Sequence, residues 1–258
     1  MSRLRARCPA CRANSAVAIG PDYECHACGR SFAAGLVRVP RAWGAGGDAM
    51  AAAARLELPY PEAAVVEEET LAMQSLAVAS ELPVRPLVLG GCCCAHVGAV
   101  EGLAARHERL GLVWIDAHGD LNTPESSPSG NEWGMPLRML LDAATVAPGD
   151  VALVGARELD EPERDYLAGS PVRLGVEGLA AALAGVDAVY AAFDADVLAP
   201  GELEAFMPEP GGLSLGEAAA LLREVASRAT LAGLGFAGLV PSERAVPALL
   251  CLCAAAGF

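Results

Sequence analysis

The stretch LGLVWIDAHGD, residues 110–120, decides the fold of this chain. Six apolar or glycine residues run without a polar break and end in Asp116, His118 and Asp120. Continuous apolar strands are typical of a parallel sheet that is covered on both faces, because a half-exposed strand would alternate polar and apolar residues. The stretch therefore predicts a central buried strand with polar side chains at its carboxyl end.

Similar apolar runs recur along the chain and alternate with helical patterns. We expect strands within residues 33–40, 85–91, 150–156, 187–196 and 230–240, and helices within residues 67–82, 96–110 and 214–229. Ser214 and Glu217 have the spacing of a capping box, which places the start of the last of these helices. Alternating strands and helices predict an α/β fold with a mainly parallel sheet, whose ligands bind beyond the carboxyl ends of the strands.

Composition excludes several classes of function. The net charge of −14 does not suit a nucleic-acid backbone, so nucleic acid is not an expected partner. All 18 basic residues are arginine, which excludes lysine as a general base or Schiff-base former. No run of apolar residues is long enough to span a membrane, and the basic start lacks the apolar segment of a signal peptide. We therefore expect a cytoplasmic protein.

Four cysteines near the start have the spacing of a zinc site. Cys8, Cys11, Cys25 and Cys28 form two C-x2-C pairs separated by thirteen residues, and each pair can present two thiolates at one tight turn. The alternative is a redox dithiol pair or free thiols. We favour one structural zinc ion, which would fold a short segment that lacks a core of its own. Cys251 and Cys253, in an apolar tail helix, are expected to be buried and inert.

Two strands end in acidic residues. Asp116, His118 and Asp120 follow one strand, and Asp194 and Asp196 follow another. Alternate residues of a strand point to the same side, so each set should converge at the sheet edge. Crowded carboxylates repel one another unless cations neutralise them, and carboxylates with one imidazole suit Mn²⁺ or a similar ion. The alternative is that these aspartates only cap helices or turns.

The same residues carry a resemblance to a known family. DAHGDLNTPESSPSGN, residues 116–131, resembles the metal and substrate loop of the arginase and agmatinase family, the ureohydrolases. FDADVLAPGELEAFMPEPGGLS, residues 193–214, is similar to its second metal strand, and residues 37–56 resemble its opening strand and loop. The likeness implies a three-layer α/β/α sandwich. It divides the chain into a zinc ribbon, residues 1–33, and an arginase-like metal-hydrolase domain, residues 34–258.

The resemblance implies a binuclear metal centre. Asp116, Asp120 and Asp194 would bind the first ion, Asp116 and Asp194 would bridge to the second, and His118 and Asp196 would complete it. Two ions that share carboxylates would hold a hydroxide that can act as a nucleophile at neutral pH.

The last ligand of the first ion departs from the family pattern. The family usually has a histidine in a GGDHS turn, where this chain has GGCCC, residues 90–94. Cys93 stands at the histidine position, and Cys92 stands where the family has an aspartate behind the ligands. We favour Cys93 as the ligand, with His96 as the alternative and Cys94 as a packing residue. A thiolate makes Zn²⁺, Fe²⁺ or Co²⁺ more competitive with the Mn²⁺ expected at the centre.

The substrate side matches the family only in part. Asn122, Ser129 and Asn131 match residues that hold the substrate carboxylate in arginases, and Asp160 falls near the acid that binds the α-amino group. Trp133 occupies the place of the histidine that shuttles protons, and indole cannot exchange a proton near neutral pH.

The glutamate that grips the guanidinium in the family is also missing. The aligned positions hold Ala237, Gly238 and Leu239, and we name Glu132 or Glu243 as replacements. A buried guanidinium without a carboxylate loses its strongest hydrogen bonds.

Two functions from different classes follow. The first is a ureohydrolase-type hydrolase that attacks a C–N bond of a guanidino-, formimino- or amide-containing small molecule with the metal-bridging hydroxide, and is not a plain arginase. In it, His118 is a ligand, Asp120 or a metal-bound water relays the proton, and Trp133 shapes the pocket. The second is a catalytically silent relative that acts as a binding or regulatory subunit through its zinc ribbon. A deacetylase-like enzyme on the related fold is disfavoured, because DAHGD is the ureohydrolase form. Family members commonly form trimers or hexamers, so a homo-oligomer is expected.

Overall fold

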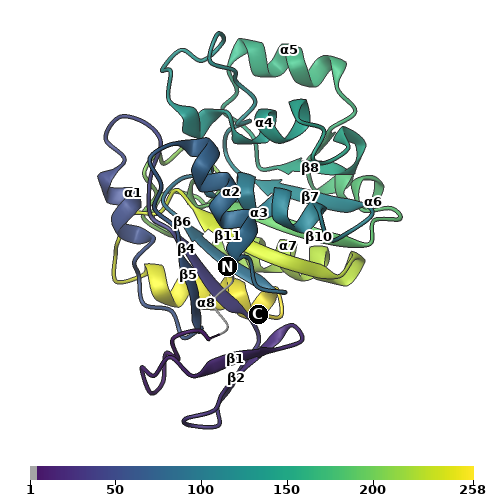
Figure 1. Ribbon diagram of the computed structural model, residues 1–258. Helices are drawn as coiled ribbons and strands as arrows, with labels where there is room; N and C mark the ends of the chain where they lie inside the picture. The colour runs from purple at the N-terminus through teal and green to yellow at the C-terminus, as the bar shows by residue number, and fades with distance from the viewer. Residues whose placement is uncertain (1–4) are drawn as a thin grey trace.

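The computed structural model describes residues 5–258, and its centre is one eight-stranded sheet in which every pairing is parallel (Figure 1). The α/β fold with a mainly parallel sheet, which the alternation of apolar runs and helical patterns predicts, is therefore confirmed. In order across the sheet, the strands are β5 (Glu62–Val65), β4 (Gly35–Val39), β6 (Pro86–Gly90), β11 (Leu231–Ala237), β10 (Ala188–Asp194), β7 (Leu110–Ile115), β8 (Val151–Val154) and β9 (Arg173–Leu174).

Helices cover both faces of the sheet, which gives the expected three layers. One face packs against α1 (Asp48–Ala53), α6 (Leu179–Ala182), α7 (Leu215–Arg228) and α8 (Ala245–Ala255). The other face packs against α2 (Leu71–Glu81), α3 (Ala95–Ala104), α4 (Pro136–Asp142) and α5 (Glu161–Gly169). Helix α7 begins at the predicted capping box of Ser214 and Glu217. None of the described helices is long and apolar enough to cross a membrane.

The four central strands are continuously apolar because they are buried on both faces of the sheet. Every residue of β6, β7, β10 and β11 is buried, with side chains such as Trp114 and Phe193 enclosed between the sheet and its helices. Each fully buried large side chain contributes roughly 1.5–3 kcal/mol. The carboxyl ends of these neighbouring strands form one edge, so the loops that follow them must meet.

Two edge strands and one thiol differ from the sequence-based expectations. Strands β5 and β9 are short, and each contains a charged residue, so neither shows the long apolar run of the central strands. Cys253 is buried as expected, but Cys251 is exposed. Residues two apart on a helix point about 200° away from each other, so α8 can bury only one of the pair.

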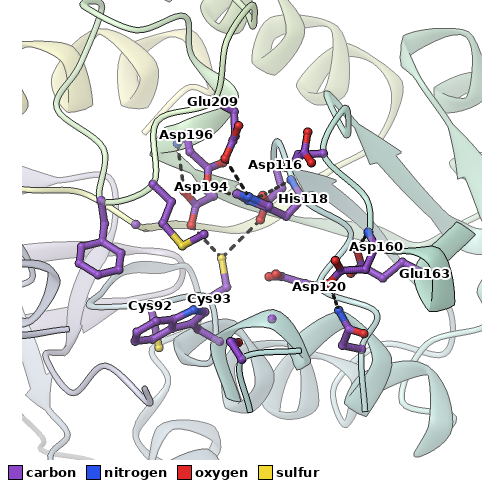
Figure 2. A pocket seen from close by; sticks show the side chains of 18 of the residues that line it. Cys92, Cys93, Asp116, His118, Asp120, Asp160, Glu163, Asp194, Asp196 and Glu209 are labelled. Atoms are coloured by element: carbon purple, nitrogen blue, oxygen red, sulfur yellow. Dashed lines mark hydrogen bonds and ion pairs between the residues drawn. The ribbon is translucent and has the colours of Figure 1, made fainter. Parts of the chain in front are cut away.

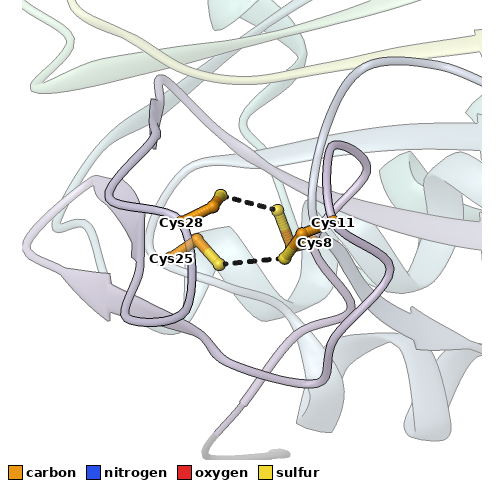
Figure 3. A group of neighbouring side chains, drawn as sticks. All are labelled: Cys8, Cys11, Cys25 and Cys28. Atoms are coloured by element: carbon orange, nitrogen blue, oxygen red, sulfur yellow. Dashed lines mark hydrogen bonds between the residues drawn. The ribbon is translucent and has the colours of Figure 1, made fainter.

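The four N-terminal cysteines lie together beside a small antiparallel sheet, with Cys25 at the end of a strand and the other three in turns and loops (Figure 3). Its strands are β1 (Ala16–Ile19), β2 (Asp22–Cys25) and β3 (Ser31–Phe32). The sulfur atoms of Cys8, Cys11, Cys25 and Cys28 all lie within 4.8 Å of one another. We call residues 5–33 the cysteine module; residues 1–4 of the predicted ribbon lie outside the described part of the chain.

The cysteine module pairs with the edge of the large sheet. The N–H groups of Arg7 and Glu62 each donate to the other residue's carbonyl, at 3.1 and 3.0 Å, and Glu62 is the first residue of β5. The guanidinium of Arg12 donates two hydrogen bonds to the carboxylate of Glu57. The module therefore covers the start of the outer strand β5, whose backbone groups at Glu62 would otherwise be unpaired.

Candidate metal centre

The first acidic loop begins where β7 ends. Asp116 follows the last strand residue, and its N–H donates to the carbonyl of Val154 at 3.0 Å. The N–H of His118 donates back to Asp116 Oδ1 at 2.8 Å, and Asp120 has a positive φ of 52°. A turn, and not strand alternation, therefore brings the three side chains together. The expected convergence occurs, but its cause differs from the one inferred from sequence.

The second acidic loop follows the neighbouring strand β10. Asp194 is its last residue, and Asp196 lies in the 3-10 turn Ala195–Val197. Asp194 Oδ1 accepts from the N–H of Asp196, and Asp196 Oδ1 accepts from the N–H of Ala117 in the first loop. Backbone hydrogen bonds thus lock the two loops and aim the remaining carboxylate oxygens at one place.

The side chains form two overlapping groups with the spacing of metal ligands (Figure 2). Within each group, one ligand atom per residue lies within 4.8 Å of the others. The first group is Cys93, Asp116 and Asp120, and the second is Asp116, His118 and Asp196. Asp116 belongs to both groups. Asp194 belongs to neither group, but its Oδ2 lies 3.1 Å from the sulfur of Cys93.

Burial and mutual repulsion disfavour the charged carboxylates of this cluster. Burial first, and then the charge of Asp196, raise the pKa of Asp194 to about 7. Burial and Asp116 raise the pKa of Asp196 to about 6. Burial and the neighbouring aspartates raise the pKa of the Cys93 thiol well above its usual value.

His118 is the one cationic side chain among the residues that line the pocket around these acids. Burial alone would lower its pKa, but hydrogen bonds and charge interactions with Asp116 and Asp196 outweigh that effect and raise it to about 12. Its Nδ1 lies 3.0 Å from Asp196 Oδ2 and 3.5 Å from Asp116 Oδ1. In the metal-free protein, the imidazolium therefore supplies part of the positive charge that the acids require.

The donor set fits divalent cations. Asp120 Oδ2 is buried and has no hydrogen-bond partner among the described residues. An orphaned carboxylate oxygen is costly in a protein interior, and an ion beside it would satisfy it. Gly238 keeps the adjacent backbone clear, because a Cβ there would lie 2.1 Å from Asp194 Oδ1.

The three consecutive cysteines divide between two environments, because Cys92 and Cys94 lie in one apolar cluster and Cys93 does not. Cys93 faces the acids, with its sulfur 3.6 Å from Asp116 Oδ2. The sulfur of Cys92 accepts from the N–H of Trp43 at 3.4 Å. Cys94 packs in an apolar cluster with Met50, as expected of a packing residue.

His96, the alternative ligand, is oriented away from the acids. Its Nδ1 lies 2.9 Å from the hydroxyl of Tyr190, its ring packs edge-on to Trp114, and it is not among the residues that line the pocket. The expectation that His96 could serve as a metal ligand is corrected by this placement, because α3 turns the ring into the core.

The acids lie in a pocket of about 310 Å³, a size suited to a small molecule. Trp133 forms one wall and packs edge-on to Phe206 with ring centroids 5.5 Å apart. A Cβ on Gly44 would lie 2.3 Å from the Trp133 ring, so only glycine allows this approach. The indole thus occupies the pocket wall that the sequence assigns to it.

The predicted substrate residues are divided between the pocket and its rim. Asn122, Ser129 and Asp160 line the pocket, and Asn122 Nδ2 donates to Asp160 Oδ2 at 2.8 Å. Asp160 also caps helix α5 together with Glu163. Asn131 is not among the lining residues, and its Oδ1 accepts from the N–H of Ala45.

Three pocket acids were missed from sequence. Glu158, Glu163 and Glu209 line the pocket, whereas the proposed replacements Glu132 and Glu243 are exposed and do not line it. Glu163 accepts from the N–H groups of Leu121 and Asp160, a role that the spacing of Asp160 and Glu163 could have indicated. Glu209 lies between two prolines in a turn, and no spacing signal marks it as a site residue.

Comparison with known proteins gives the family. The sequence profile described as "Arginase family" matches residues 46–245. The chain belongs to the arginase family. Hydrolases of this family act on C–N bonds of non-peptide substrates and use a binuclear metal site, typically with manganese.

Sequence similarity to an individual family member extends over part of the chain. An arginase from Bacillus subtilis is 38% identical over 158 residues, which cover 51% of this chain and 53% of that relative. The chain thus spans about half the length of this relative.

Solved structures of the arginase family share the fold. The arginase from Bacillus cereus has a TM-score of 0.74 and 24% identity, covering 86% of this chain and 97% of that chain. The formimidoylglutamase from Bacillus subtilis has a TM-score of 0.70 and 18% identity, covering 86% and 85%.

Proposed function

We propose that this protein is a binuclear metal hydrolase that cleaves a C–N bond of a small molecule. The observation that carries the proposal is the pair of ligand groups that share Asp116, beside a buried Asp120 oxygen without a partner among the described residues. Cys93, Asp116, Asp120 and Asp194 would hold one ion, and Asp116, His118, Asp194 and Asp196 the other. Two divalent ions, when bound, supply Lewis acidity and a nucleophile at neutral pH.

The thiolate at Cys93 sets the preference of the first site. Three carboxylates and a thiolate form a softer ligand set than carboxylates with an imidazole, so Zn²⁺, Fe²⁺ or Co²⁺ competes better with Mn²⁺ there. The second site contains only carboxylates and an imidazole and keeps the preference for Mn²⁺. The cofactor assignment is therefore two divalent ions of one or two kinds.

The pocket favours a substrate that differs from free arginine. The end of β11 offers Ala237, Gly238 and Leu239 where a guanidinium-binding glutamate is expected, and Gly238 lies too close to Asp194 for any side chain. Trp133 stands where arginases have the histidine that shuttles protons, so that proton transfer is absent. A modified guanidine, a formimino group or an amide remains, and the shared fold with a formimidoylglutamase supports including the formimino group.

Residues of the pocket would bind the substrate and transfer a proton. Asn122, Ser129 and Asp160 would bind the polar end of the substrate, and Trp133 would stack on its flat reacting group. Asp120 would relay the proton of the attacking hydroxyl group to the leaving nitrogen as the C–N bond breaks, because its buried carboxylate borders the ion site.

We also propose that Cys8, Cys11, Cys25 and Cys28 bind one structural zinc ion. Their convergence within 4.8 Å supports this assignment over separate thiols. The ribbon boundary at residue 33, a homo-oligomeric state, a protein partner for the ribbon and a cytoplasmic location stay predictions.

Metal content and a substrate panel test the proposal together. Protein purified without chelators should contain about one zinc ion and two further divalent ions. Guanidino, formimino and amide compounds should include a substrate, and Asp116→Ala or Asp194→Ala should reduce turnover by about 10²-fold or more while the fold is retained. Zinc alone, with no further uptake and no hydrolysis, would instead identify a silent binding or regulatory relative.

A further inference from the structure

Glu209 lies against the free nitrogen of His118. Its Oε1 is 3.6 Å from His118 Nε2, and its side chain is largely buried at the pocket wall (Figure 2). The other ring nitrogen, Nδ1, faces Asp116 and Asp196, with which His118 forms one of the two ligand groups. The two nitrogens of the ring therefore face two different environments.

This arrangement decides which nitrogen can bind a metal ion. An imidazole binds a metal through its unprotonated nitrogen, and the other nitrogen then carries a proton that needs an acceptor. Nδ1 points at the acids that would share the ion, so Nε2 must carry the proton. Glu209 is the carboxylate that faces Nε2, at an ion-pair distance of 3.6 Å.

The backbone that carries Glu209 is held in place. Pro208 and Pro210 flank it, and the guanidinium of Arg157 donates to the carbonyls of Glu209 and Pro210 at 3.1 and 3.0 Å. Arg157 also donates to the carbonyl of Asp196 at 2.7 Å. One arginine thus joins the loop with the ligand Asp196 to the loop with Glu209, which fixes the backbone of Glu209 relative to the second ion site.

We propose that Glu209 is a positioning residue that holds His118 with its proton on Nε2 and its Nδ1 toward the second metal ion. This inference rests on the proposed binuclear centre. Acceptors behind a ligating histidine fix its tautomer and ring orientation, and removing one typically costs about 10–100-fold in metal affinity.

A manganese titration tests the role without any substrate. Protein with zinc already in its cysteine module is titrated with Mn²⁺, and free Mn²⁺ is followed by electron paramagnetic resonance. Glu209→Ala should weaken the second-ion affinity by about 10–100-fold. Glu209→Gln should recover most of that loss, because an amide oxygen at the same place is also an acceptor for Nε2–H. Glu158→Gln is the matched control, since it removes the same charge from the same pocket and should bind Mn²⁺ like the unmodified protein.

The imidazole itself gives a second readout that a general structural effect would not move. The chain has four histidines, so ¹⁵N-histidine spectra of the Zn²⁺-loaded protein are simple to assign. His118 should show a bound Nδ1 and a slowly exchanging Nε2–H proton, which should exchange rapidly in Glu209→Ala.

The outcomes separate two failures. Unmodified protein that binds no Mn²⁺ would overturn the binuclear centre and this inference with it. Two bound Mn²⁺ ions with equal affinities in Glu209→Ala and Glu158→Gln, and an unchanged Nε2–H signal, would overturn the role of Glu209 alone. An effect of Glu209→Ala on substrate KM with unchanged metal affinity would place Glu209 on the substrate instead, which also contradicts the proposal.

Discussion

A single thiol distinguishes this centre at the scale of residues. Cys93 lies within 3.1 Å of Asp194 and 3.6 Å of Asp116, and its pKa is raised well above the usual value by burial and by these acids. In the metal-free protein the sulfur therefore keeps its proton and donates it to the carboxylates. A bound ion would displace that proton, because only the thiolate is a metal ligand.

Replacing this thiol should change the metal preference. We expect Cys93→His to raise Mn²⁺ affinity at the first site by roughly tenfold, equivalent to about 1.4 kcal/mol, because imidazole suits Mn²⁺ better than a thiolate does. The absorption band from sulfur to Co²⁺ should also disappear in Cys93→His. It is measured with zinc already bound in the cysteine module, so that the four module thiols do not contribute to the band. Cys94→Ala is the control, since that thiol packs among apolar side chains. Unchanged Mn²⁺ binding and an unchanged Co²⁺ band in Cys93→His would exclude Cys93 as a ligand.

The sequence predicts which residues gather at this site better than it predicts how they are held. Asp116, Asp120, Asp194 and Asp196 stand at or just after the ends of apolar strands. An apolar run that ends in aspartates is therefore enough to locate them in the sequence. Glu209 comes from a proline-rich turn with no periodicity, and its place beside His118 depends on tertiary hydrogen bonds from Arg157. Likewise, a helical pattern alone cannot say that α3 turns His96 toward Tyr190.

At the scale of elements, the ends of the large sheet are the part that sequence patterns miss. A central strand is buried on both faces and must be apolar, whereas β5 and β9 are short edge strands with charged residues. One of these edges is covered by the cysteine module, through the reciprocal hydrogen bonds of Arg7 with Glu62 and the ion pair of Arg12 with Glu57. The four-cysteine site and the sheet edge should therefore be stabilised together.

Loss of the cysteine site should loosen that edge selectively. In Cys25→Ser, we expect amide exchange in β5, most of all at Glu62, to accelerate by about 5–30-fold, which corresponds to roughly 1–2 kcal/mol of local stability. Strands β7 and β10, at the centre of the sheet, should keep their protection. Cys251→Ser, which changes an exposed thiol on α8, should leave both regions unaffected. Equal acceleration in the centre and at the edge would show that the module supports the whole fold and not this edge.

At the scale of the whole molecule, the buried acids couple folding to pH and to metal binding. Asp194 and Asp196 have pKa values raised to about 7 and about 6, and His118 to about 12. All three pKa values are higher in the folded state, so the metal-free folded protein binds more protons than the unfolded chain. The stability contributed by the charged His118 is complete below its unfolded pKa and is lost as the pH rises toward its folded pKa. Unfavourable ionisation of the two aspartates adds to the loss up to about pH 7.

The metal-free protein should consequently become less stable as the pH rises, and bound metal should remove this dependence. Between about pH 5 and pH 8, we expect its free energy of unfolding to fall by several kcal/mol, on the order of 5, because each extra proton held by the folded state contributes about 1.4 kcal/mol per pH unit. With two divalent ions bound, the same carboxylates are neutralised without protons, and metal affinity itself rises with pH. The gap in Tm between metal-loaded and metal-free protein should therefore widen across this range. Parallel Tm curves for the two forms would mean that the acids bind no metal in the folded protein. A gap that widens in unmodified protein but not in Asp196→Asn would locate the coupling at the second ion.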